Sequence, residues 1–121
     1  MLARAVEAVR ERVPSTGVVG APELWSGLAL HTSRSVAPSA RFQPGEGGPV
    51  WGTPADQFAV WSAAGIDHIV LENAGVVHLA ALDELEARCP GAVQLQASWA
   101  GGLLVRLGWD EACKALLVPG G

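Results

Sequence analysis

The sequence is poor in several features that mark common classes of protein. It has no tyrosine, one lysine, two cysteines and no apolar run near the roughly 18 residues of a membrane-spanning helix. Eight basic residues stand against 12 acidic ones, and the arginines do not cluster. The sequence therefore predicts neither a membrane nor a nucleic acid as a partner.

The two cysteines, Cys89 and Cys113, are isolated and form no CxxC motif. Residues 1–13 carry scattered charges and do not resemble a secretory signal. Two isolated thiols in such a chain most often stay reduced in the cytosol. We therefore expect free structural cysteines in a cytoplasmic protein. The bias towards Ala, Gly, Val and Arg is typical of GC-rich bacterial coding sequences.

Sequence motifs of catalysis are also scarce. There is no GxSxG, no glycine-lysine phosphate loop, and no sequence context that would activate either cysteine. The sequence thus favours a protein that is not an enzyme and needs no cofactor.

One set of residues keeps a chemical alternative open, namely His68, Glu72 and His78. Two imidazoles and a carboxylate are ligand types of a three-ligand zinc site. On one strand, however, His68 and Glu72 would lie about 13 Å apart, too far to share a metal. We expect no metal, with a small enzyme or metal protein using this face as the alternative.

The stretch from 92 to 109 reads as a β-hairpin. A three-residue loop at 100–102 pairs Trp99 with Leu103, Ala97 with Val105, and Leu95 with Leu107. This register places the apolar side chains on one face and the glutamines on the other, because side chains alternate along a strand. We therefore expect Leu95, Val105 and Leu107 to be buried.

A second hairpin is predicted over 67–82, with its loop at 73–75. Its favoured register pairs Leu71 with Val77 and Ile69 with Leu79, and so leaves His68, Glu72 and His78 on the outer face.

Helices are predicted at 2–13, 54–64, 83–89 and 111–118 from apolar spacing and capping residues. Short strands are predicted at 16–21 and 24–32, and a mobile loop at 33–50, where proline and glycine are frequent. Together these elements indicate one α+β domain over 1–121, a mostly antiparallel sheet with helices packed against it.

Apolar residues on the helix at 54–64 suggest a surface for association. Phe58, Val60 and Trp61 occupy much of its circumference, more than one buried stripe requires. We expect a homodimer that uses this helix or an exposed sheet edge. A ligand pocket near the 33–50 loop, lined by Trp25, Trp51 or Trp61, is the competing use of these aromatics.

Three stretches resemble the Roadblock/LC7 family: VRERVPSTGVVG, then ELWSGLALHTS, and later IDHIVLENAGVVHLAAL. The resemblance implies a Roadblock/profilin-like layout and a non-catalytic homodimer that pairs through a central helix and an edge strand. It also implies regulation of a small GTPase, and no catalytic residue carries over. Our expectation is a cytosolic binding or regulatory module that acts through protein–protein contacts.

Overall fold

The computed structural model describes residues 2–21, 32–39, 41–42, 49–50, 54–72 and 76–118. Their elements are, in order, α1 (Leu2–Arg12), β1 (Val18–Ala21), β2 (Ser35–Pro38), β3 (Arg41–Phe42), β4 (Pro49–Val50), α3 (Pro54–Ala63), β5 (His68–Glu72), α4 (Val76–Arg88), β6 (Val93–Trp99), β7 (Gly102–Leu107) and α5 (Glu111–Leu117). None of the helices in these ranges has the length and apolar character needed to span a membrane.

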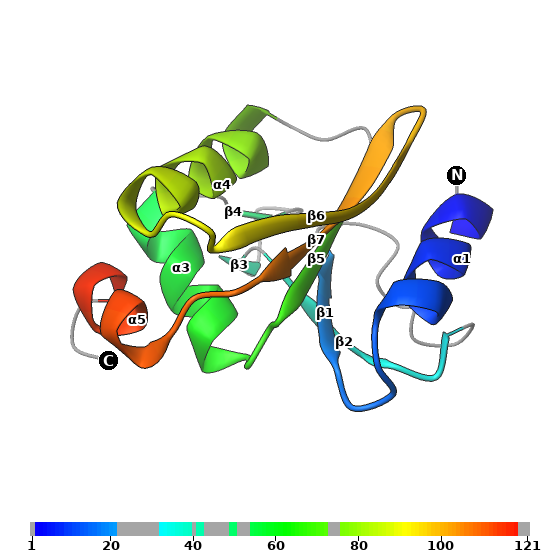
Figure 1. Ribbon diagram of the computed structural model, residues 1–121, viewed down its shortest axis with the longest axis horizontal. Coiled ribbons are helices and arrows are strands. Elements are labelled where there is room, and N and C mark those ends of the chain that lie inside the picture. The colour runs from blue at the N-terminus through cyan, green and yellow to red at the C-terminus, as the bar shows by residue number, and fades with distance from the viewer. Residues whose placement is uncertain are drawn as a thin grey trace.

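A five-stranded sheet in the order β2-β1-β5-β7-β6 forms the centre of the fold. β1 runs parallel to β2 and β5, whereas β7 runs antiparallel to β5 and β6. The antiparallel ladders are the longer ones, so the sheet is mostly antiparallel and the predicted α+β class is confirmed. Helix α1 covers one side of the sheet, and α3, α4 and α5 lie on the other (Figure 1).

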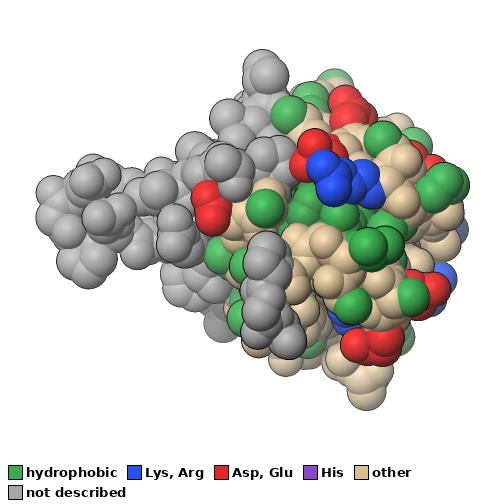
Figure 2. Space-filling view, turned by 90° about the vertical axis from the view of Figure 1, so that its left-hand side faces the viewer, with side chains coloured by type: hydrophobic (Ala, Val, Ile, Leu, Met, Phe, Trp, Pro, Cys, Tyr) green, Lys and Arg blue, Asp and Glu red, His purple; other side chains and the backbone are tan. Residues whose placement is uncertain are grey.

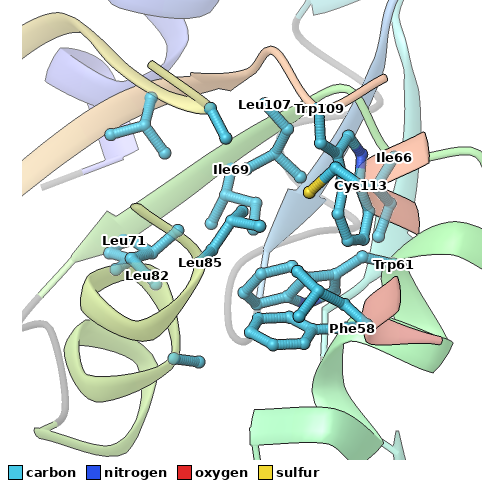
Figure 3. Close-up of a cluster of buried hydrophobic side chains, with 14 residues drawn as sticks. Phe58, Trp61, Ile66, Ile69, Leu71, Leu82, Leu85, Leu107, Trp109 and Cys113 are labelled. Carbon is cyan, nitrogen blue, oxygen red and sulfur yellow. The ribbon is translucent and has the colours of Figure 1, made fainter. Parts of the chain in front are cut away.

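The side of the sheet under α3, α4 and α5 holds the larger core. We call it the aromatic core because Phe58, Trp61 and Trp109 meet there edge to face, with ring centroids 5.5 to 6.5 Å apart. Ile69, Leu85 and other aliphatic side chains complete it (Figure 3). Packing of aromatic rings in this geometry adds to the gain from burying their area.

The other side of the sheet holds a smaller core, which we call the α1 core. Helix α1 buries alanines and valines against the sheet, and these are Ala5, Ala8, Val9 and Val13. They meet Val19 of β1, Val70 of β5 and Leu104 of β7. The predicted helix at 2–13 is therefore confirmed as α1, and its buried face docks on the sheet.

The predicted helices at 54–64 and 111–118 are also confirmed, as α3 and α5. Asp110 caps α5, since its carboxylate accepts a hydrogen bond of 2.8 Å from the Cys113 amide. The predicted strand at 16–21 is confirmed as β1, whereas the strand at 24–32 falls almost entirely outside the described residues.

The predicted hairpin at 67–82 is wrong, because its second half belongs to a helix. β5 covers 68–72, and α4 runs from Val76 to Arg88, absorbing the short helix expected at 83–89. Ala81, Leu82 and Leu85 of α4 are buried at helical spacing. β5 instead takes its partners from β1 and β7, which are distant in the sequence.

The prediction of a mobile loop at 33–50 is wrong in part. Ser35–Pro38 forms β2 and pairs with β1, and Arg41–Phe42 pairs with Pro49–Val50 in a separate two-stranded sheet. Proline is compatible with β2 because this strand lies at the edge of the sheet. Residues 40 and 43–48 of the interval lie outside the described residues.

The hairpin of β6 and β7 exists, but its register differs from the predicted one. Trp99 pairs with Gly102 across a two-residue turn, and a bulge between Leu95 and Ala97 shifts the ladder beyond it. Gly101 supplies the turn with a φ of 84°. Val105 and Leu107 are buried as predicted, but Leu95 is 63% exposed because β6 is an edge strand.

The two cysteines are also not free. Cys89 and Cys113 form a disulfide, with their Cα atoms 6.2 Å apart, which corrects the expectation of reduced thiols. The sequence did not reveal this pairing, because the two cysteines are 24 residues apart. Only the fold brings the end of α4 to the start of α5.

The observed register makes a testable prediction at Gly102. A Cβ atom added there would overlap the indole nitrogen Nε1 of Trp99, so Gly102→Ala should destabilise the fold by about 1–3 kcal/mol in a urea melt. In a Trp99→Ala background the same change should cost much less, because the indole is gone. An equal cost in both backgrounds would contradict the pairing of Trp99 with Gly102.

Candidate functional site

The structure does not assemble the predicted His68, Glu72 and His78 set on one outer sheet face. His68 is only 4% exposed and lies on the α1 side of the sheet, paired with Arg106 of β7. Glu72 ends β5 and His78 lies in the first turn of α4, and only their backbones are described. Within the described ranges, no three His, Cys, Asp or Glu residues are grouped to hold a metal.

His68 forms a close pair with the residue before it. Its Nδ1 lies 2.6 Å from Oδ1 of Asp67, and the same oxygen accepts the Val18 amide hydrogen at 3.0 Å. The Asp67 backbone also bonds to Val18 and to Leu107. This carboxylate therefore fastens β1 and His68 to the start of β5. Burial of the imidazole keeps it from a substrate in solution, so the pair has a structural role.

Of the three tryptophans predicted to line a pocket, the structure describes only Trp61. Trp61 is fully buried, and its Nε1 donates a hydrogen bond of 2.9 Å to the carbonyl of Ser39. Trp25 and Trp51 lie outside the described residues. The position of Trp61 is thus explained by the aromatic core and by a satisfied indole N–H.

The predicted interface on α3 needs correction for the same reason. Phe58 and Trp61 are buried within the single chain, and Val60 is half-buried against the aromatic core. The two aromatic rings of this helix are covered by the chain's own elements, so neither ring lies on the surface for a second molecule.

The feature that stands out on the surface is β6, the longest strand of the sheet. It has seven residues, lies at the sheet edge and carries no charge and no proline. The opposite edge strand, β2, has four residues and ends at Pro38. Edge strands of soluble proteins are normally protected by charge, proline or short length. β6 has none of these three protections. Its bulge is confined to the region between Leu95 and Ala97.

The first part of this edge is occupied by a side chain. The two carboxylate oxygens of Glu86 accept hydrogen bonds from the amides of Gly91, at 2.8 Å, and Val93, at 3.0 Å. These two hydrogen bonds hold the pKa of Glu86 below its ordinary value of 4.5, and the bond from Gly91 has the larger effect. We call this arrangement the Glu86 clamp, and the edge beyond it begins at Leu95.

Exposed leucines mark where apolar surface reaches solvent. Leu95 is 63% exposed on β6 and Leu116 is 79% exposed on α5. On the side of the molecule shown in Figure 2, acidic and basic side chains are scattered among hydrophobic ones. Sequence reasoning missed Leu95 because simple alternation places it inside. The available signal was the absence of charge along 93–99.

Comparisons with known proteins give no match, whether to family models, to curated proteins or to solved structures. The Roadblock/LC7 resemblance therefore stays a prediction from the sequence.

The Glu86 clamp predicts a defined pH dependence. Because the folded pKa lies below the unfolded one, the clamp's stabilisation is complete above pH about 4.5 and is lost as the pH falls through the folded pKa. Glu86→Gln should therefore unfold at lower urea than wild type at pH 7, and the gap should narrow at acid pH.

The matched control is Asp83→Asn, another exposed acidic residue of α4. It should follow the wild-type urea midpoint at both pH values. A Glu86→Gln gap that stays constant between pH 7 and acid pH would contradict the role of the ionised carboxylate.

Proposed function

We propose that this chain is a non-catalytic binding module whose partner is a second copy of itself, joined edge to edge through β6. The observation that carries the proposal is an uncharged edge strand with the solvent-exposed Leu95 at the start of the part that the Glu86 clamp leaves open. Addition of a strand to an exposed edge is a common mode of protein recognition, because it satisfies unpaired backbone groups.

The lack of charge favours a second copy over an unrelated strand. In a two-fold symmetric pair the same surface meets itself, so a charged edge strand would set like charges close together. β6 has no charge to repel its own copy. Antiparallel pairing about Leu95 would place this leucine opposite its equivalent and Gln94 opposite the equivalent of Gln96.

The side chains along the edge suit this pairing. Gln96 Nε2 already donates to the Gln94 carbonyl at 3.2 Å, so amide groups lie beside the strand and can bond across a symmetric contact. Association would also remove the exposed part of Leu95 from water, which is favourable for apolar area. The alternative route through α3 has lost its support, since Phe58 and Trp61 are buried.

Two finer expectations stand on other grounds. A small GTPase as a further partner is implied only by the family resemblance. The cytoplasmic location rested largely on reduced thiols, and the Cys89–Cys113 disulfide removes that support.

The experiment is a comparison of two lysine variants by sedimentation velocity over a range of concentrations. Leu95→Lys places two like charges at the centre of the symmetric contact and should convert the wild-type dimer to a monomer. Leu116→Lys is the matched control, because it also replaces an exposed leucine but lies on α5. It should remain a dimer.

Both positions are exposed, so neither lysine enters a core and both variants should keep the wild-type circular dichroism spectrum. A wild-type chain that stays monomeric at high concentration would overturn the proposal. Dimers that persist in Leu95→Lys, or that dissociate in Leu116→Lys, would place the contact elsewhere and also overturn it.

A further inference from the structure

The Cys89–Cys113 disulfide joins two cysteines that are 24 residues apart in the sequence. Cys89 directly follows the last residue of α4, and Cys113 is the third residue of α5. The bond therefore fixes the C-terminal helix of the described chain to the helix that precedes the β6–β7 hairpin.

Helix α5 has little else to hold it in place. It has seven residues, of which Cys113 and Leu117 are buried. An isolated helix of this length is unstable in water, so tertiary contacts must hold it. Lys114 adds a weak contact, with its Nζ 5.6 Å from the centre of the Trp109 ring. The disulfide is thus the strongest single attachment of α5.

What α5 covers makes this attachment important. Cys113 and Leu117 belong to the aromatic core, and Cys113 lies beside Trp109 (Figure 3). Loss of α5 would expose these tryptophan and leucine side chains to water, which is unfavourable for apolar area.

The bond is also reachable from solvent. A cavity of about 260 Å³ is lined by both cysteines together with Pro90, Trp109 and Asp110, among others. Cys89 itself is only half-buried. Cys113 is buried, so Cys89 is the side of the bond that lies nearer to solvent.

We propose that Cys89 and Cys113 are an oxidation site and that this chain matures in an oxidising compartment, with a disulfide-bearing oxidant as co-reactant. Stable disulfides are characteristic of such compartments and rare in the cytosol of mesophiles. The proposal goes beyond pairing through β6 and does not depend on it.

The chemistry is an ordinary thiol–disulfide exchange. One cysteine thiolate attacks the oxidant's disulfide, forms a mixed disulfide and releases one thiol of the oxidant. The second cysteine then attacks the protein sulfur of that bond and releases the other thiol. Two electrons and two protons pass in total from the cysteines to the oxidant, which leaves as a dithiol.

The first test counts free thiols. The full chain is reduced and unfolded, refolded in a mixture of reduced and oxidised glutathione, then treated with iodoacetamide and weighed by intact mass spectrometry. The expected product carries no alkyl group. A folded product with both cysteines alkylated would overturn the proposal.

The second test measures what the bond does for the fold. Treatment with a dithiol should raise the equilibrium constant for unfolding by roughly several hundredfold, as expected for opening a closed loop of this length. Amide hydrogen exchange should accelerate in α5 while β5 and β7 stay protected. The double variant Cys89→Ser/Cys113→Ser should match the reduced wild type and show no response to dithiol.

Each outcome decides the proposal even if the double variant fails to fold, because the oxidised and reduced wild type are compared directly. Equal unfolding equilibria and equal exchange in α5 would mean that the fold gains nothing from oxidation. That result would overturn the proposal that this chain matures in an oxidising compartment.

Discussion

The fold depends on how β5 joins the parallel and antiparallel halves of the sheet. Asp67, the residue before this strand, holds both halves through its backbone and its carboxylate. Its amide and its side-chain oxygen bond to Val18 at the start of β1, and its carbonyl accepts the Leu107 amide at 2.8 Å from the end of β7. Because β5 also carries Ile69 into the aromatic core and Val70 into the α1 core, the register set at Asp67 positions both cores. β7 in turn pairs with the edge strand β6 and so sets its position.

Much of the local structure was predictable from the sequence, because its causes are local. The apolar spacing of α1, the proline at the first position of α3, and the Asp110 cap of α5 each act within a few residues. The sheet was less predictable, because β1 pairs in parallel with partners that lie far along the chain. Val76 and the apolar residues after it alternate well enough to mimic a strand, and only packing of Leu82 and Leu85 distinguishes the helix.

The candidate site was harder to predict than the fold, and for a different physical reason. Whether Leu95 is buried or exposed depends on a bulge and on the position of β6 at the edge of the sheet formed by the described strands. Neither can be inferred from the alternation of residues. Trp61 shows the reverse error, since an apolar helix face with no assigned cover looks like an interface until the core that covers it is known. The disulfide likewise joins residues whose proximity only the fold creates.

The connection from α4 to β6 links the open edge to the rest of the molecule. Within residues 86–93, the Glu86 clamp fixes two backbone amides and Cys89 is bonded to α5. An edge that is already rigid loses less conformational entropy when it pairs, so the Glu86 clamp favours association. The clamp acts on the backbone of β6 itself, whereas the disulfide acts on α5. Reduction therefore loosens the end of the aromatic core but leaves Val93 anchored. The clamp and the disulfide both involve this eight-residue connection. Because each acts on a different element, edge pairing and oxidation remain physically independent.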